Sequence, residues 1–147
     1  MRITYRTDYA LKTILELGLH FGQDSAPTIH EIAERLDIPE KFLEQILLDL
    51  KRGGFVESRR GKIGGYFLSQ KPREITLGKV IRFIEGPIEP VACVGHNYKG
   101  CQDIRSCVFR NIWQRVAEST AKIIDGITFE DLVKQVKGKE AVSSYSI

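Results

Sequence analysis

Two short amphipathic helices separated by only three residues are predicted over residues 28–52, and this pattern constrains the fold most strongly. The first opens with "TIHE", in which Thr28 and Glu31 have the spacing of a capping box. After "DIP", Pro39 suits the first turn of the next helix. The apolar residues of that helix recur at i, i+3, i+4 and i+7: Leu43, Ile46, Leu47 and Leu50. Helix, short turn and amphipathic helix is the helix-turn-helix pattern.

The segment that follows, "FVESRRGKIGGYFLS", predicts a β-hairpin. Two β-runs, 55–58 and 65–68, flank a basic turn that contains glycine. Residues 1–50 carry five basic and nine acidic side chains, whereas residues 51–73 carry seven basic and one acidic. A basic hairpin directly after the second helix is typical of a winged helix-turn-helix protein. The plainer interpretation of the basic residues is a solvated charged face.

A helix with a polar start fits the major groove, and a flexible Arg/Lys hairpin fits beside it. Arg59 and Arg60 are the stronger candidates for groove or phosphate contacts, because guanidinium groups bind bidentately. Gln45 can read adenine and Glu44 can accept from cytosine, although Glu44 alone is equally well explained as an exposed helix charge. The residues predicted to bind DNA are Thr28, Pro39, Lys41, Glu44, Gln45, Arg59, Arg60, Lys62, Gly64 and Gly65.

A long helical pattern near residues 104–125 predicts a second role, namely self-association. Its apolar stripe needs a partner, and a second copy of the chain is the economical one. The stripe residues predicted for the interface are Phe109, Ile112, Trp113, Val116 and Ile123. The alternative is that this helix packs back on the winged unit of the same chain. The expected units are a winged domain (1–70), a linker with a connecting helix (71–86), a cysteine loop (87–103), a dimerisation helix with a final helix (104–137) and a flexible tail (138–147).

All three cysteines lie within one stretch of 15 residues, as Cys93, Cys101 and Cys107, with the spacing C-x7-C-x5-C. This spacing is more open than the knuckles of structural zinc sites. A loop rich in glycine and polar residues suits an iron–sulfur cluster, which needs thiolate ligands and normally four of them. His96 is a candidate for the fourth ligand by proximity. A small redox switch is the alternative use of the thiols.

The net charge of +3 does not by itself indicate a partner. No apolar run approaches the roughly 18 residues of a membrane span, and the start lacks the apolar stretch of a signal peptide. We therefore expect a cytoplasmic protein with reduced thiols and no membrane partner. No C-x-x-C, phosphate-binding glycine loop or Ser/His/Asp arrangement indicates an enzyme.

Taken together, these features resemble the IscR/NsrR-type winged-helix regulators, a family of dimeric bacterial transcription factors that sense through an iron–sulfur cluster. The resemblance covers nearly the whole chain. It rests on "TDYALKTILEL", on "IAERLDIPEKFLEQILLDLKRGGFVESRRGKIGGYFL", on "ITLGKVIRFIEG" and on the three-cysteine loop. The implied fold is mainly α with a small β-hairpin: a winged helix-turn-helix domain plus a long dimerisation helix.

The resemblance also implies a [2Fe–2S] or [4Fe–4S] cluster on Cys93, Cys101 and Cys107. One branch of the family has a histidine ligand three residues after the last cysteine, where this chain has Arg110, which cannot ligate. In the nitric-oxide-sensing branch an aspartate of the other subunit serves, and Asp8 stands in the matching "TDYAL" context. The first cysteine interval is longer than in the best-known members, which leaves the cluster type and the fourth ligand (Asp8 or His96) open.

The resulting prediction is a homodimeric regulator, expected to be a repressor, that binds a pseudo-palindromic DNA operator under control of the cluster. The alternative is a cluster-free regulator that reversible thiol oxidation switches.

Overall fold

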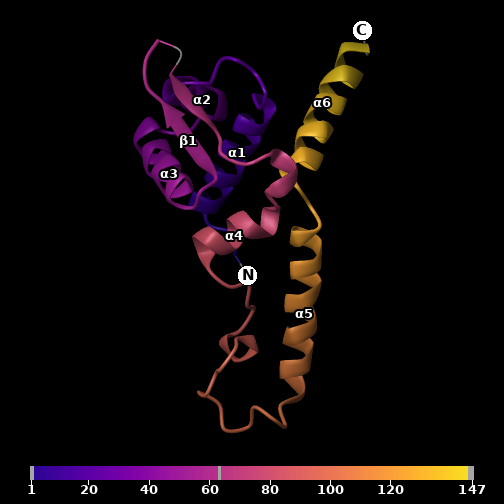
Figure 1. The fold of residues 1–147 in the computed structure, drawn as a ribbon. Helices are drawn as coiled ribbons and strands as arrows, with labels where there is room; N and C mark the ends of the chain where they lie inside the picture. The colour runs from indigo at the N-terminus through magenta and orange to yellow at the C-terminus, as the bar shows by residue number, and fades with distance from the viewer. Residues whose placement is uncertain (1, 63, 146–147) are drawn as a thin grey trace.

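The computed structural model describes residues 2–62 and 64–145, which form six α-helices and one β-hairpin (Figure 1). The elements in chain order are α1 (Tyr5–Leu19), α2 (Ile29–Leu36), α3 (Glu40–Arg52), β1 (Val56–Arg59), β2 (Gly65–Leu68), the 3-10 turn η1 (Pro72–Glu74), α4 (Leu77–Glu85), the 3-10 turn η2 (Ala92–Val94), α5 (Val108–Asp125) and α6 (Phe129–Tyr145). No helix in the described part of the chain is long and apolar enough to cross a membrane.

Helices α2 and α3 form the predicted helix-turn-helix. Thr28 Oγ1 accepts from the Glu31 N–H at 3.3 Å, and Glu31 Oε2 accepts from the Thr28 N–H at 2.7 Å, so the predicted capping box is confirmed. Asp37 ends α2 in the left-handed region (φ 51°), and Pro39 precedes α3. The predicted apolar face of α3 is buried in the core.

The wing is an antiparallel pair in which Val56 faces Leu68 and Arg59 faces Gly65. The first strand therefore lies one residue later than the predicted 55–58 run. Gly65 packs so tightly against the 26–27 backbone that an added Cβ would lie 2.6 Å from Pro27 O. The Tyr66 N–H donates to the same carbonyl at 2.9 Å. These contacts fix the base of the wing to the segment that leads into α2.

The core extends beyond residue 70, the expected end of the winged unit. Ile75, Val80 and Phe129 are buried in one cluster with residues of α1 and α3. The segments around residues 76 and 128 lie side by side and form an isolated antiparallel bridge. The Leu77 N–H donates to Ile127 O and the Phe129 N–H donates to Ile75 O, each at 2.9 Å. Helix α6 thus returns to the winged unit after α5 has left it (Figure 1).

Two predicted boundaries are wrong. The long helix begins at Val108 and not near residue 104, because residues 102–106 form turns in which the Cys107 N–H donates to Asp103 O at 2.9 Å. The last helix does not end near residue 137, since α6 continues to Tyr145. The expected tail is therefore helical over 138–145, where Lys139, Glu140 and Ala141 favour a helix. Residues 146 and 147 of that tail lie outside the described residues.

Candidate nucleic-acid interface and cysteine loop

The exposed face of α3 holds three of the residues predicted to bind DNA. Lys41, Glu44 and Gln45 are all exposed, on the side of α3 away from the buried leucines. Pro39, at the N-terminal end of the same helix, is exposed as well. The first two turns of α3 therefore present Lys41, Glu44 and Gln45 to solvent, together with the 62% exposed ring of Phe42. Exposed polar side chains at the start of the helix are the arrangement a recognition helix needs.

The wing presents cations beside this face. Arg60 and Lys62 are exposed, and neither forms an ion pair within the part of the chain that the structure describes. Arg59 differs, because its guanidinium lies over the Phe67 ring at 4.6 Å from the centroid. The cation–π contact holds the guanidinium over the Phe67 ring while its N–H groups remain available for an acceptor.

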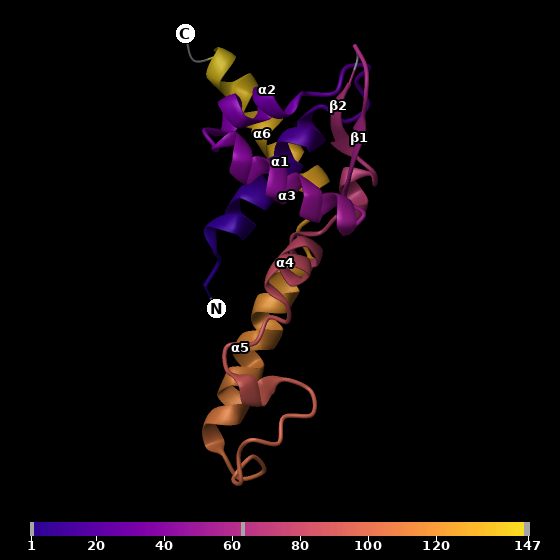
Figure 2. The same ribbon diagram turned by 90° about the vertical axis from the view of Figure 1, so that its left-hand side faces the viewer.

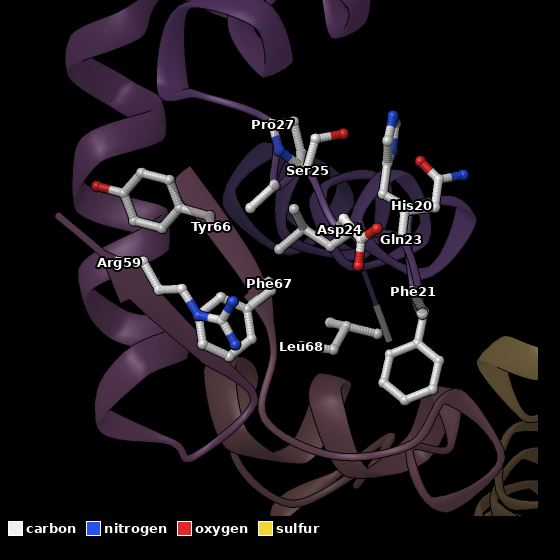
Figure 3. Close-up of a pocket in the computed structure, with 13 residues that line it drawn as sticks. His20, Phe21, Gln23, Asp24, Ser25, Pro27, Arg59, Tyr66, Phe67 and Leu68 are labelled. Atoms are coloured by element: carbon white, nitrogen blue, oxygen red, sulfur yellow. The ribbon is translucent and has the colours of Figure 1, made fainter. Parts of the chain in front are cut away.

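Arg59 lines two hollows at the wing. One, of about 430 Å³, is bounded by Thr28, Arg60 and Gly64. The other, of about 340 Å³, lies against the loop after α1, where His20, Asp24 and Tyr66 border it (Figure 3). Figure 3 shows the Arg59 guanidinium stacked on Phe67 at this second hollow. The structure therefore brings Thr28, Arg59, Arg60 and Gly64 together, as the predicted DNA-binding set requires.

The two wing glycines have structural reasons of their own. A Cβ on Gly64 would lie 2.6 Å from Arg59 O and 2.8 Å from Gly61 O, and Gly65 is buried. Gly64 and Gly65 therefore allow the tight turn and the packing of the wing. Their contact with DNA stays a prediction, as do the DNA contacts of the other predicted residues.

The three thiols lie on the connection between α4 and α5. Cys93 lies in η2, Cys101 is exposed in the loop, and Cys107 precedes the first residue of α5. All three are free cysteines. The Arg110 Nε donates to Cys93 O at 3.1 Å, which ties the start of the loop to α5. Arg110 therefore has a structural contact at the position where a related branch has a ligand.

In this conformation the thiols are not gathered. Among the described residues no three His, Cys, Asp or Glu side chains stand close enough to hold one metal ion. His96 lies in a hollow with Arg82, Glu89 and Ala121, at the junction of α4 and α5. Asp8, the other candidate ligand, is half-exposed on α1 and accepts from Lys12 Nζ at 2.7 Å.

An ion pair that the sequence did not reveal joins the two helices on either side of the cysteine loop. Arg82 of α4 donates from Nη1 and Nη2 to the two carboxylate oxygens of Asp125 at the end of α5, at 2.5 and 2.8 Å. These hydrogen bonds are the main reason that the pKa of Arg82 is raised and the pKa of Asp125 is lowered. Gly78 makes room for the pair, because a Cβ there would overlap Asp125 Oδ1. We call this pair the α4–α5 clamp.

Away from the clamp, α5 extends from the winged unit (Figures 1 and 2), and the side chains of its apolar stripe are exposed. The predicted interface residues are between 38% exposed (Trp113) and 63% exposed (Ile123). Of the described residues of α5, Ile124 alone is buried. The alternative in which α5 packs back on the winged unit of its own chain is therefore wrong. A row of five exposed apolar side chains on one helix marks an interaction surface.

The fold and the basic hairpin beside an exposed helix define a winged helix-turn-helix protein. Residues 3–135 match the family Rrf2, described as an iron-dependent transcriptional regulator. An rrf2-like HTH-type transcriptional regulator of Rhodobacter capsulatus is 42% identical over 137 residues, covering 89% of this chain and 91% of the relative. The chain belongs to the Rrf2 family of transcriptional regulators.

Two solved structures of this family are similar to the chain. The first is CymR, described as the global cysteine regulator of B. subtilis, with a TM-score of 0.78 at 31% identity. The alignment covers 92% of this chain and 98% of the CymR chain. The second is IscR of T. potens, with a TM-score of 0.74 at 29% identity; the alignment covers 92% of this chain and 88% of the IscR chain. The predicted family and the mainly helical winged fold are thereby confirmed.

Proposed function

We propose that the protein is a homodimeric transcription regulator that binds double-stranded DNA through α3 and the wing and is switched by an iron–sulfur cluster on its cysteine loop. The observation that carries the DNA-binding part is the juxtaposition of an exposed polar α3 face with the exposed cations of the wing. The observation that carries the cluster is that all three cysteines of the chain are free thiols on one loop.

The recognition elements act in two ways. Gln45 and Glu44, on the exposed side of α3, supply an amide and a carboxylate for base edges in the major groove. Arg59, Arg60 and Lys62 supply positive charge to phosphates or to the minor groove, which sets the position of the wing but reads little sequence. Each phosphate contact adds affinity that falls as salt rises.

Two such heads are needed for a pseudo-palindromic operator. In a symmetric dimer the α5 stripe pairs with its own copy, which covers Phe109, Ile112 and Trp113. The two winged units then have a spacing set by α5 and by its junction with α4. The clamp fixes that junction, and the cysteine loop leaves α4 at Glu85, three residues after Arg82, so a rearrangement of the loop would reach the junction through the end of α4.

The donor chemistry of the loop fits an iron–sulfur cluster. Cys93, Cys101 and Cys107 would provide three thiolates, and Cys107 stands at the N-terminal end of α5, which favours anionic groups. Asp8 of the second copy is our candidate for the fourth ligand; its present partner is the neighbouring Lys12, in an exposed pair that contributes little. When bound, the cluster supplies a group that oxidants, nitric oxide or iron shortage can alter.

The loop can gather its thiols at low cost. Cys101 is exposed, and the described residues around it are turns and bends with few backbone hydrogen bonds beyond those at 103–107. Arg110 and the Cys107 N–H hold the two ends of the loop in place. A DNA affinity change follows only if the gathered and released loops favour different positions of the recognition helices.

Anaerobic purification tests the cluster. We expect a coloured dimer that contains iron and sulfide in comparable amounts, and Cys101→Ala should lose both while it stays a folded dimer. Asp8→Ala should alter the cluster spectrum or its lifetime, with Asp24→Ala as the matched control. An unchanged spectrum in Asp8→Ala would remove Asp8 from the ligand set.

The second candidate is a cluster-free regulator switched by thiol oxidation, which the likeness to CymR favours because CymR of Staphylococcus aureus has been solved in an oxidized form. In that case the anaerobic protein is colourless, three thiols titrate, and a mild oxidant joins two of them reversibly. The same purification therefore separates the two functions.

A further inference from the structure

A hollow of about 440 Å³ lies between the end of α1, η1 and α6, away from both the wing and the cysteine loop. It exists because α6 crosses α1 at Gly18, where a Cβ would come within 3.0 Å of Val133 Cγ2. Helix α1 ends at Leu19, one residue after this crossing, whereas α6 continues to Tyr145. Val133, Pro72 and the ring of Phe21 form the apolar floor, and Phe21 is left 46% exposed. In Figure 3 the Phe21 ring points away from Pro27 and toward the C-terminal helix.

The rim of the hollow is cationic. Lys71 and Arg73 lie on one side, and Lys134 and Lys137 lie one turn apart on α6 on the other. Among the described residues that line it, the single acidic side chain is Glu130, whose carboxylate is 3.6 Å from Lys134 Nζ. Four cations against one carboxylate leave a lining charge of +3. Lys71, Arg73 and Lys137 form no ion pair within the described residues.

We propose that this hollow binds a small organic anion that carries an apolar group, such as an aromatic or branched carboxylate or phosphate ester. Sites for small molecules are concave, with an apolar lining and a few charged groups that fix orientation. Here the floor takes the apolar part and the lysines and Arg73 take the anionic head. The volume admits a molecule of this size and excludes a folded partner.

The hollow lies on the far side of α1 from the recognition helix. Helix α1 packs against α3 on one side and against α6 on the other, and Figure 2 shows α6 behind α1 with α3 in front. A ligand in the hollow therefore leaves the DNA-binding face free. A ligand there would touch η1, which follows the wing, and α6, which follows α5, and the lining contains no residue of the cysteine loop.

The test is an NMR titration of the isotope-labelled dimer with phenyl phosphate, inorganic phosphate and phenol. Phenyl phosphate should shift the amides of Phe21, Arg73 and Val133, and it should bind more tightly than either of its two parts. The double variant Lys134→Gln/Lys137→Gln should raise the Kd for phenyl phosphate roughly tenfold, since each exposed charge contact changes a Kd by up to about a factor of five. Lys139→Gln, on the same helix outside the hollow, should leave binding unchanged.

Three results would overturn the proposal. In the first, phenyl phosphate shifts the wing or α3 amides and not those of the hollow. In the second, inorganic phosphate binds as tightly as phenyl phosphate, so the apolar floor contributes nothing. In the third, the double variant, shown by its spectrum to be folded, binds as the native protein does. The cluster content of the sample is measured in parallel, so failure of this site is distinct from failure of the proposed switch.

Discussion

Truncating Ile112 to alanine should weaken the dimer by one to two orders of magnitude. Ile112 is half exposed in the single chain and lies in the middle of the α5 stripe. Full burial of an isoleucine side chain is worth about 1.5–3 kcal/mol, so covering the exposed half contributes about 0.8–1.5 kcal/mol. A two-fold interface buries the residue twice, which gives about 1.5–3 kcal/mol, or roughly 10- to 150-fold in the dimer Kd.

Sedimentation equilibrium over a concentration series measures this Kd directly. Val142→Ala is the control, because Val142 is an apolar residue of α6 that is 67% exposed and lies outside the stripe. Helical content from circular dichroism should be unchanged in both variants, since alanine favours a helix. A dimer Kd that does not change in Ile112→Ala, or a native protein that is monomeric throughout, would refute the assignment of the stripe.

Three further substitutions test the rest of the account. The double variant Arg59→Ala/Arg60→Ala should weaken DNA binding. The slope of log K against log salt concentration should fall by about one for each phosphate that the wing no longer neutralises, whereas Lys139→Ala should change neither quantity. Unaltered binding in the double variant would contradict the role of the wing. Gly78→Ala should displace the α4–α5 clamp and lower the free energy of unfolding by about 1–3 kcal/mol in chemical denaturation; unchanged stability and DNA binding would show the clamp to be dispensable. Glu85→Gln should lower the melting temperature at neutral pH, with a difference from the native protein that disappears as pH falls well below 4.5; a constant difference would contradict the reasoning.

The sign of the pH effect follows from the contacts of Glu85. Its carboxylate accepts from the hydroxyls of Thr4 and Thr7 and from the Thr4 N–H, and these hydrogen bonds lower its pKa below the usual 4.5. A carboxyl whose folded pKa is lowered stabilises the fold above its unfolded pKa. That stability is lost as pH falls through the folded pKa. Acid should therefore loosen the contact between α1 and α4.

Local signals explain why the helix-turn-helix and the wing could be predicted. The capping box of Thr28 and Glu31, Pro39 before α3, and the glycines around the basic turn each act within a few residues of themselves. The positions of the helices along the chain follow from apolar residues that recur at helical spacing. The residues of the α5 stripe likewise follow from spacing alone, and the structure leaves them exposed as an interface requires.

What the sequence could not reveal depends on contacts between distant segments. Gly78 looks like any glycine in a helix, yet it makes room for Asp125, which lies on another helix. Phe129 has no local sign that it completes the core of the winged unit. The stacking of Arg59 on Phe67 also depends on strand register. The proposed cluster also depends on distant contacts, because it would bring three thiols of one loop together with Asp8 of a second copy.

The most direct test of the central claim is a comparison of DNA affinity with and without the cluster. A duplex selected from a random pool by the anaerobic dimer is titrated with that dimer and with the same preparation after its iron has been removed by a chelator. We predict Kd values that differ by about 5- to 150-fold, the range of a typical coupling free energy, and that become equal in Cys101→Ala. Equal Kd values for the two native preparations, both shown to be dimeric, would contradict the proposed switch.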